Sequence, residues 1–412
     1  MTGPARDFVG YGPKPPDFDW PGGARIAVNL VVNYEEGGEY SLTEDGVNDT
    51  WGEYSFQYGP EIRDIGTETH MEYGSRVGIW RLCRLIDRYQ IPVTFAACAL
   101  AVERNPPLGE WLRSRDHDVL AHGYHWYGPD AVGMDRDQER DEIRRAVDSL
   151  LRTTGRPPRG WMVRSFPTVH TRELLVEHGG FRYDSDANND ELPYYADTLG
   201  TPFLVVPYSK VHNDVRYLIA PTYATPRHFF ESLRLSLDYL LDEARHGYGA
   251  RLMTVGVHAR WSGQPGRASA VRDFIEYALS QDGVRFMRRI DVAEFWARSF
   301  PPAPALPVVL GADHPGHHLA AQEAPDVLGR HADADVKGAV RDARVVRGSE
   351  QVGQVEERVP GAEGRPRARL VPPRVDSGAE VGVSAQVLVE GLLVHDGGPA
   401  HVHQDRGGLH QA

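Results

Sequence analysis

The sequence predicts an α/β protein whose residues 1–300 form a parallel (β/α) barrel of about seven strands. Apolar runs of strand length recur along these residues, and segments with helical spacing of apolar positions fall between them. Strands that alternate with helices indicate a parallel sheet, and the lack of a glycine-rich dinucleotide-binding motif favours a barrel over an open sheet. A change of composition after residue 300 places the end of this domain.

Each strand is predicted from a short apolar run bounded by polar or turn residues. The predicted strands are Arg25–Val32, Val93–Ala99, Asp118–Ala121, Gly160–Val163, Pro202–Val206, Leu252–Val257 and Val284–Met287. The predicted helices are Ser75–Tyr89, Gln138–Thr153, Thr171–His178, Pro226–Ala244 and Arg267–Ser280. The first of these helices carries an apolar face made of Val77, Ile79, Trp80, Leu82, Leu85 and Ile86.

The C-terminal residues 301–412 lack the residue types that build a core. From Ala303 onward there is no Phe, Trp, Tyr, Ile, Asn, Thr, Met or Cys, and Lys337 is the one lysine. We therefore predict a low-complexity, disordered tail. A frameshift near Pro301 in a GC-rich gene is one hypothesis that would explain this restricted amino-acid composition. Two histidine pairs in the tail, His317-His318 and His401-x-His403, are interpreted as solvated side chains and not as a metal-binding tract.

Composition and charge argue against several classes of function. No stretch approaches the roughly 18 consecutive apolar residues of a membrane span, so we expect no membrane partner. The formal charge of -13 argues against binding to a phosphate backbone, so we expect no nucleic-acid partner. Cys83 and Cys98 are too few to staple this domain, and the opening MTGPARDFVG lacks the pattern of a secretory signal. We therefore predict a cytoplasmic protein with reduced thiols.

Ionisable side chains follow most of the predicted strands. The first strand is followed by Glu35 and Glu36, and later strands are followed by His122, Arg164 and His258. In a parallel barrel the carboxyl ends of all strands open on one face, so these groups would meet in a single mouth. Polar residues also mark the starts of ordinary loops, and that interpretation stays open for any one strand. Their convergence predicts an enzyme.

Glu35 and His258 are the candidate catalytic pair. Two adjacent carboxylates resist ionising together, which can raise the pKa of one of them toward that of a general base. His258 follows a different strand, so a proton-transfer role with Glu35 is geometrically allowed. Arg164 or Arg260 would stabilise an oxyanion or clamp a carboxylate or ureido oxygen, although either could be a structural ion-pair partner. For His122, a satisfied core histidine is the alternative.

These residues resemble the polysaccharide deacetylase, or NodB homology, family. The shared pattern is a strand ending in two acids, a second ending in His-Gly, an Arg-x-x-Pro turn and a late strand ending in His. Further segments are similar to the branch containing the cofactor-independent allantoinases: NYEEGGE at 33–39, MEYGSR at 71–76, HGYHW at 122–126, ELPYY at 191–195, Asn213-Asp214-x-Arg216 and HARWSGQPGR at 258–267. The resemblance covers about residues 5–300. It implies a deformed (β/α) barrel and hydrolysis of a carbon–nitrogen bond.

The resemblance, together with the strand-end pattern, also suggests a set of substrate-binding residues. We expect them to be Glu36, His122, His125, Trp126, Arg164, Asn213 and Arg260. His125 stands where the allantoinases tend to have Arg, and residues 164–171 replace a glycine-containing Arg segment. A substrate other than allantoin therefore stays open.

The metal-dependent members of the family use an Asp-Asp pair, whose first acid is the base and second a ligand, and two histidines spaced His-x-x-x-His. Here the acids are Glu35 and Glu36, and Trp126 stands four residues after His122. A catalytic zinc needs about three protein ligands, and Glu36 with His122 supplies two. We therefore favour chemistry without a cofactor. A zinc ion on Glu36, His122 and His125 is the alternative.

Three functions follow from this reasoning. In the first, a small-molecule amide or ureide is hydrolysed as in an allantoinase: Glu35 takes a proton from water, Arg164 stabilises the oxyanion with help from His122 or His125, and His258 protonates the departing nitrogen. The second is metal-dependent deacetylation of an N-acetyl sugar of the chitooligosaccharide type. The third is a non-catalytic barrel that binds a ureide or a sugar.

Aromatic side chains gather between the first strand and the first helix. They are Trp51, Tyr54, Phe56 and Tyr58, in a segment rich in Gly and acids. A connection of this length is usually a lid or a subunit contact, so the segment is compatible with a homo-oligomer.

Overall fold

The computed structural model describes residues 4, 6–46, 62–126, 133–164, 167–218 and 222–302. The predicted tail from residue 303 onward and the aromatic segment 51–58 lie outside the described residues. None of the helices in these ranges is long and apolar enough to cross a bilayer.

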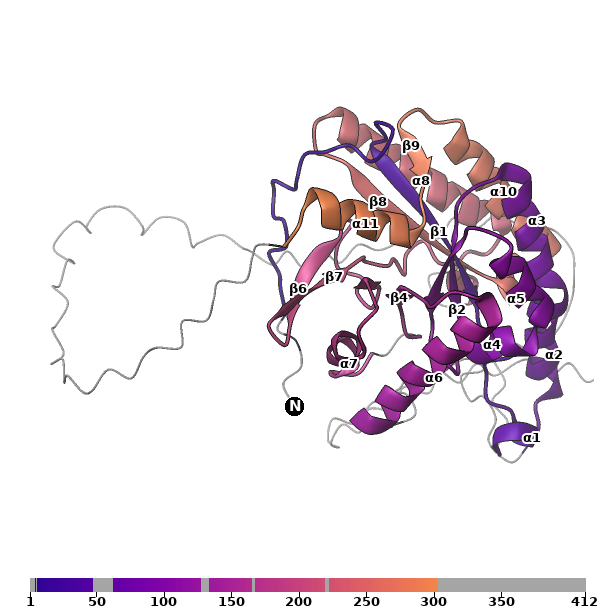
Figure 1. Ribbon diagram of the computed structural model, residues 1–412. Coiled ribbons are helices and arrows are strands. Elements are labelled where there is room, and N and C mark those ends of the chain that lie inside the picture. Colours follow the sequence, from indigo (N-terminus) through magenta and orange to yellow (C-terminus); the bar gives the residue numbers. More distant parts are fainter. Residues whose placement is uncertain are drawn as a thin grey trace, which may run out of the picture. The chain divides into compact units, whose positions relative to one another are not determined.

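A curled, mostly parallel sheet forms the centre of the fold (Figure 1). Its strands are β1 (Ile26–Tyr34), β2 (Thr94–Ala97), β3 (Asp118–Ala121), β4 (Gly160–Trp161), β5 (Tyr183–Asp184), β6 (Tyr194–Thr198), β7 (Thr201–Val205), β8 (Arg251–His258) and β9 (Val284–Phe286). The order across the sheet is β6-β7-β5-β4-β3-β2-β1-β8, and β9 pairs with the first half of β1. The pairing of β6 with β7 is antiparallel. The predicted deformed α/β barrel is confirmed.

The deformation lies where the ladder of strands is interrupted between β8 and β6, the two ends of the strand order. On that edge of β8, the Leu252 N–H donates to Glu191 O at 2.9 Å, and the Gly256 N–H donates to His212 O at 2.9 Å. Irregular segments therefore satisfy the backbone of β8 where a closed barrel would place another strand. The sheet covers about half of a barrel wall, and its carboxyl ends still share one rim.

Helices surround the sheet (Figure 1). They are α1 (Leu42–Asp45), α2 (Ile65–Tyr73), α3 (Ile79–Tyr89), α4 (Ala99–Arg104), α5 (Pro106–Arg113), α6 (Arg136–Thr154), α7 (Thr171–His178), α8 (Pro226–Arg245), α9 (Ala259–Ser262), α10 (Pro265–Leu279) and α11 (Arg289–Ser299), with a π-helical turn η1 (Gly74–Gly78) and a 3-10 turn η3 (Asp214–Tyr217). Capping residues in the sequence determine where several helices begin. Asp135 and Gln138 form a capping box on α6, and Thr225 caps α8 ahead of Pro226.

Most predicted elements are confirmed to within a few residues, and α7 and β3 agree at both ends. The predicted helix 75–89 is divided between η1 and α3. Sequence reasoning missed β5, β6, α11 and several shorter helices. The β6–β7 hairpin turns at Leu199 and Gly200, both with positive φ, and a leucine there gives no turn signal. Strand β5 has only two residues, too few for a periodic pattern.

Strand β1 shows how the sequence divides the two faces of the sheet. Ile26, Val28, Leu30, Val32 and Tyr34 belong to the apolar cluster beneath the surrounding helices. The alternate positions Ala27 and Val31 belong to a second cluster on the other face, together with side chains of α11. Because side chains alternate along a strand, Asn29, Asn33 and Glu35 share that inner face. Glu35 is thus directed to the inside by the strand's own period.

A fully buried arginine, Arg289, fills the inside of the sheet. Its guanidinium donates to Asn29 Oδ1 at 2.9 Å, to Ser185 Oγ at 2.9 Å and to Pro207 O at 2.8 Å, with Val206 O as a further acceptor. These acceptors are neutral, so hydrogen bonds rather than an ion pair compensate the buried charge. Arg289 ties β1 to the segments that follow β5 and β7.

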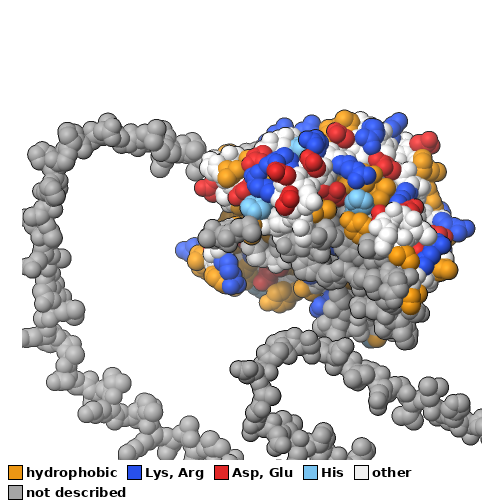
Figure 2. All heavy atoms as spheres, turned by 90° about the horizontal axis from the view of Figure 1, so that it is seen from below, with side chains coloured by type: hydrophobic (Ala, Val, Ile, Leu, Met, Phe, Trp, Pro, Cys, Tyr) orange, Lys and Arg blue, Asp and Glu red, His pale blue; other side chains and the backbone are white. Residues whose placement is uncertain are grey.

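The outer surface mixes charges of both signs. In the described part of the face seen in Figure 2, Lys and Arg side chains alternate with Asp and Glu. Among the described residues, several such charges pair along a helix, as Arg140 does with Asp137 and Arg144 with Asp141.

Candidate active site

Glu35 and Glu36 are adjacent in sequence but point in opposite directions. They follow directly after β1, and both carboxylates are buried. Glu35 continues the inner face of the strand. Glu36 lies toward the helices, where Gly74 of η1 makes room for it: a Cβ on Gly74 would lie 2.6 Å from Glu36 Cγ. The pleat of the strand therefore separates the two acids.

Two imidazoles meet the same oxygen of Glu35. His122 Nε2 lies 3.2 Å from Glu35 Oε1, and His258 Nε2 lies 3.4 Å from it. His122 follows β3 and His258 ends β8, so three strands contribute to this cluster. The predicted convergence of Glu35, His122 and His258 at the rim is what the structure shows.

His258 is held between two carboxylates. Its Nδ1 lies 2.6 Å from Asp214 Oδ1, and its backbone N–H donates to Asp214 Oδ2 at 2.8 Å. Ser262 Oγ donates to the same Oδ2 at 2.6 Å. Asp214 accepts three hydrogen bonds, so the Nδ1 proton faces Asp214 and Nε2 faces Glu35.

The protonation of His122 follows from its two hydrogen-bond partners. His122 Nδ1 lies 2.6 Å from the carbonyl oxygen of Met162, which can only accept. Nδ1 therefore carries a proton, and a hydrogen bond across the 3.2 Å contact with the Glu35 carboxylate requires a second proton, on Nε2.

Arg260 bridges the two glutamates. Its Nη2 lies 2.8 Å from Glu35 Oε2, and its Nη1 lies 3.3 Å from Glu36 Oε1. The backbone N–H of Arg260 also donates to Glu36 Oε1 at 2.7 Å. The side chain is 1% exposed, so the guanidinium acts as a buried cation between two acids. Glu35 Oε2 has this ion-pair contact but accepts no hydrogen bond from the described residues.

The charges separate the pKa values of the two glutamates. Burial would raise the pKa of Glu35, but the charges of His258 and Arg260 hold it well below its usual range. Burial raises the pKa of Glu36, which shares only Arg260 of these cations. The pKa values of the two glutamates differ, as the sequence argument expected. The raised pKa, however, belongs to Glu36 and not to Glu35, the candidate base.

The pKa of His258 is raised to about 10. Burial lowers it, and the carboxylates of Glu35 and Asp214 outweigh burial. His258 is therefore an imidazolium at neutral pH, with a proton on Nε2 directed toward Glu35. The two groups are strongly coupled, so a proton lost by one changes the affinity of the other for its own.

The remaining predicted residues surround this centre in different ways. The Arg164 guanidinium lies 3.4 Å from the centroid of the Trp126 ring, and that of Arg260 lies 5.2 Å from it. His125 stacks on Tyr40, and its backbone N–H donates to Glu142 at 2.9 Å. These groups lie at the rim beside the acids.

Asn213 supports the site from behind. Its Oδ1 caps η3, the turn that begins with Asp214, and its Nδ2 donates to Tyr208 OH at 3.0 Å. Gly256 leaves space for this pair, because a Cβ there would lie 2.0 Å from Tyr208 OH. We therefore interpret Asn213 as a residue that positions Asp214, whereas the sequence argument had it bind the substrate.

The side chains proposed for a zinc ion do not form a common donor set. Both carboxylate oxygens of Glu36 accept hydrogen bonds from backbone N–H groups, and the ring nitrogens of His122 face Met162 and Glu35. His125 faces Glu142. Within the described ranges, no group of three or more His, Cys, Asp or Glu side chains is placed to hold a metal ion. Trp126, four residues after His122, offers a π face that contacts guanidinium cations and no lone pair.

Sequence reasoning missed Asp214 and Glu142 as partners of the site histidines. Asp214 lies 44 positions before His258, in a turn that periodicity does not reveal. The motif Asn213-Asp214-x-Arg216 could have revealed Asp214. It contributed to the family resemblance, but the sequence argument assigned no role to its aspartate.

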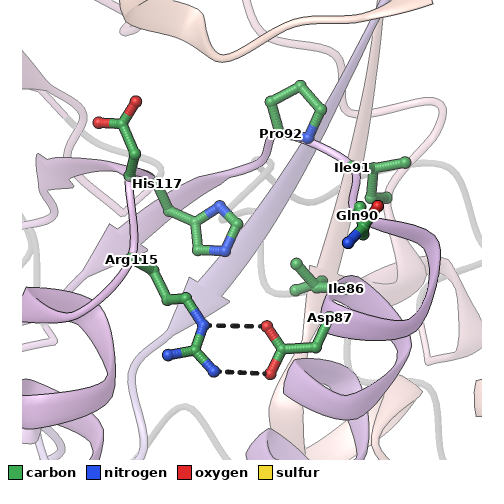
Figure 3. A pocket seen from close by; sticks show the side chains of 8 residues that line it. Ile86, Asp87, Gln90, Ile91, Pro92, Arg115 and His117 are labelled. Atoms are coloured by element: carbon green, nitrogen blue, oxygen red, sulfur yellow. Dashed lines mark hydrogen bonds and ion pairs between the residues drawn. The ribbon is translucent and has the colours of Figure 1, made fainter.

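A separate cavity opens at the other end of the strands. It has a volume of about 380 Å³ and lies where β2 and β3 begin. Figure 3 shows Arg115 directed onto Asp87 across this cavity, with both contacts at 3.1 Å. Because Arg115 and Asp87 pair with each other and the acids of the rim lie at the opposite strand ends, we do not assign the chemistry to this cavity.

Comparisons with known proteins agree with the geometry. Residues 70–168 match the family described as polysaccharide deacetylase. A Schizosaccharomyces pombe protein described as a polysaccharide deacetylase is 32% identical over 318 residues, which cover 72% of this chain and 98% of that protein. A peptidoglycan deacetylase of Helicobacter pylori is 30% identical over 173 residues, 41% of this chain and 56% of that protein.

Two solved structures are similar to the same extent in sequence. PuuE allantoinase is 38% identical, with a TM-score of 0.68, over 72% of this chain and 99% of that one. A Pseudomonas aeruginosa PAO1 protein described as a probable polysaccharide deacetylase is 38% identical, with a TM-score of 0.67 and the same coverage. Because the chain is equally similar to both structures, the substrate has to be argued from the residues of the site.

Proposed function

The chain belongs to the polysaccharide deacetylase family, and on that premise we propose that it hydrolyses a carbon–nitrogen bond of a small cyclic amide or ureide. Allantoin is the first candidate substrate, because its ring amide and ureido group offer both donors and acceptors to the polar rim. In this proposal the reaction uses the protein's own side chains.

The buried guanidinium of Arg260 is the observation that supports this proposal most. It lies within 2.8 Å of Glu35 and 3.3 Å of Glu36, so these acids already share a cation. A metal ion bound to Glu36 would have to replace two backbone hydrogen bonds and approach this guanidinium. Electrostatic repulsion and lost hydrogen bonds oppose that exchange.

Water attack begins at Glu35. Its Oε2, which contacts Arg260 Nη2, keeps a lone pair that can accept a hydrogen bond from water, and in the reaction it takes one proton as the water oxygen bonds to the substrate carbonyl carbon. The carbonyl oxygen becomes an oxyanion, which Arg164 at the rim stabilises. Glu35 is a weak base while both cations face it. Its proton affinity rises once His258 gives up its proton, because the opposing charge is then removed.

His258 completes the reaction. Its Nε2 proton passes to the departing nitrogen as the carbon–nitrogen bond breaks, which leaves Glu35 protonated and His258 neutral. The proton of Glu35 then returns to His258 Nε2 across the 3.4 Å contact with Oε1, and the starting state is restored. Asp214 stabilises the imidazolium throughout, and His122 fixes the position of the Glu35 carboxylate.

The proposal is tested by incubating the purified protein with allantoin, other ureides and N-acetyl sugars, with and without a chelator. The protein is purified without chelator and its metal content is measured first. We expect a ureide to gain the mass of water at a rate that the chelator does not change. Acetate release from an N-acetyl sugar that depends on stoichiometric zinc would contradict the proposal, as would calorimetric binding without product. Glu35→Gln serves as the control of strongly reduced activity.

A further inference from the structure

A continuous hydrogen-bonded path leads from Asp186 to His122 through one peptide group. Asp186, two residues after β5, accepts the N–H of Val163 on Oδ1 at 2.8 Å. The carbonyl of the same peptide group, Met162 O, lies 2.6 Å from His122 Nδ1. The other nitrogen of that ring faces Glu35. Asp186 thus lies two hydrogen bonds away from the imidazole at the centre of the site.

We propose that Asp186 is a positioning residue for His122, because it fixes the plane of the Met162–Val163 peptide and thereby the proton on Nδ1 and the orientation of the ring. The inference rests on the proposed function, in which His122 holds the Glu35 carboxylate. It adds a residue that sequence motifs gave no role.

The local structure explains why this peptide needs an external partner. Strand β4 ends at Trp161, and Met162 N–H donates to Ala121 O at 3.0 Å as the ladder ends. Beyond that bond the ladder offers no acceptor to Val163, so the Asp186 side chain supplies one. Hydrogen bonds at both ends of one peptide group polarise it and strengthen each other. Without the Asp186 bond, the peptide plane and its carbonyl could rotate away from His122.

Asp186 is not needed for the neighbouring ion pair. Arg172 contacts Asp184, with Nε at 2.6 Å and Nη2 at 3.1 Å from its carboxylate. Asp186 Oδ2 is buried and accepts no hydrogen bond from the described residues. Burial, and then the charge of Asp184, raise the pKa of Asp186 well above its usual range. Asp186 Oδ1 is thus an acceptor on a carboxyl group whose charge is disfavoured, and an asparagine of the same shape keeps that acceptor.

This chemistry defines a pair of substitutions with opposite outcomes. Asp186→Asn keeps an oxygen for the Val163 N–H, so kcat and the state of His122 should match those of the wild type. Asp186→Ala removes the acceptor, and kcat should fall about ten-fold, the usual scale of one hydrogen bond, with KM unchanged. Ser185→Ala is the matched control, because it removes a hydrogen bond to Arg289 from the same segment and leaves the peptide path intact.

The deciding readout is nitrogen-15 NMR of the His122 ring in the unliganded protein. We expect Nδ1 to be protonated in the wild type, in Asp186→Asn and in Ser185→Ala, and only partly protonated in Asp186→Ala. An unchanged His122 spectrum in Asp186→Ala overturns the inference, even if turnover falls. A shifted spectrum in Asp186→Asn also overturns it, and that variant decides the matter if Asp186→Ala does not fold. The spectrum needs no substrate, so failure of this inference is separable from failure of the proposed function.

Discussion

Replacing Asp214 with asparagine should convert His258 from a permanent imidazolium into a group that titrates near neutral pH. Asp214 is fully buried and accepts from His258 Nδ1, from His258 N–H and from Ser262 Oγ. Asparagine keeps the shape but removes the charge and one acceptor. Since an opposite charge at this distance shifts a pKa by roughly 1–3 units, the pKa of His258 should fall from about 10 by that amount.

The hydrogen-bond geometry also predicts the wrong tautomer in Asp214→Asn. The asparagine oxygen can satisfy the His258 N–H and Ser262 only if its NH₂ group faces Nδ1. A donor at that position requires a lone pair on Nδ1, so the ring proton of the neutral form moves to Nε2. The ring then resists becoming the imidazolium that the proposed mechanism uses. Loss of a positioned acid costs roughly 100- to 10,000-fold, and kcat should fall within that range.

The assay is the pH dependence of kcat for the substrate identified in the incubation above, combined with NMR titration of His258. Ser262→Ala is the control, because it removes one hydrogen bond from Asp214 and leaves its charge. The wild type and Ser262→Ala should lose activity as the pH approaches 10, and Asp214→Asn should lose it at a lower pH. An Asp214→Asn enzyme with the wild-type pH profile and kcat would refute this reasoning.

Three other predictions concern the same cluster. Glu35→Gln should lower kcat roughly 100-fold or more, and a variant with full turnover would remove Glu35 from the role of base. Gly74→Ala places a Cβ 2.6 Å from Glu36 Cγ, so urea denaturation should show a loss of roughly 1–3 kcal/mol, whereas Gly266→Ala, whose nearest contact is 4.0 Å away, should be near neutral. The free energy of unfolding should fall as the pH rises from 6.5 to about 10, because only the folded state keeps the His258 proton in that range; a flat dependence would show that the pKa of His258 is not raised.

Periodicity predicted those parts of the fold in which one face of an element is buried. Strand β3 and helix α7 were located to the residue because apolar runs and helical spacing mark both. Helix α11 was missed although its Val292, Ala293 and Trp296 are buried. It follows β9 after only two residues and starts at Arg289, a buried charge that masks the apolar pattern.

The sequence predicts those site residues that lie at the ends of strands. It does not predict the residues that act through hydrogen bonds to other site residues. Glu35 and His258 each follow or end a strand, so a parallel sheet brings them together. The roles of Asp214 and Asp186 arise from hydrogen bonds to groups far along the chain, and no local pattern encodes those contacts. The different pKa values of Glu35 and Glu36 likewise depend on Arg260, whose position between them is set by the turn after β8.

The most direct test of the central claim is the rate of ureide hydrolysis measured against the metal content of the same protein sample. The account predicts a constant kcat for allantoin, or for the ureide that replaces it, from metal-free protein to protein supplied with zinc. Arg260→Met should abolish that activity without making the protein dependent on zinc. A rate that rises in proportion to bound zinc, and vanishes with chelation, would contradict the claim that Arg260 supplies the cation of this site.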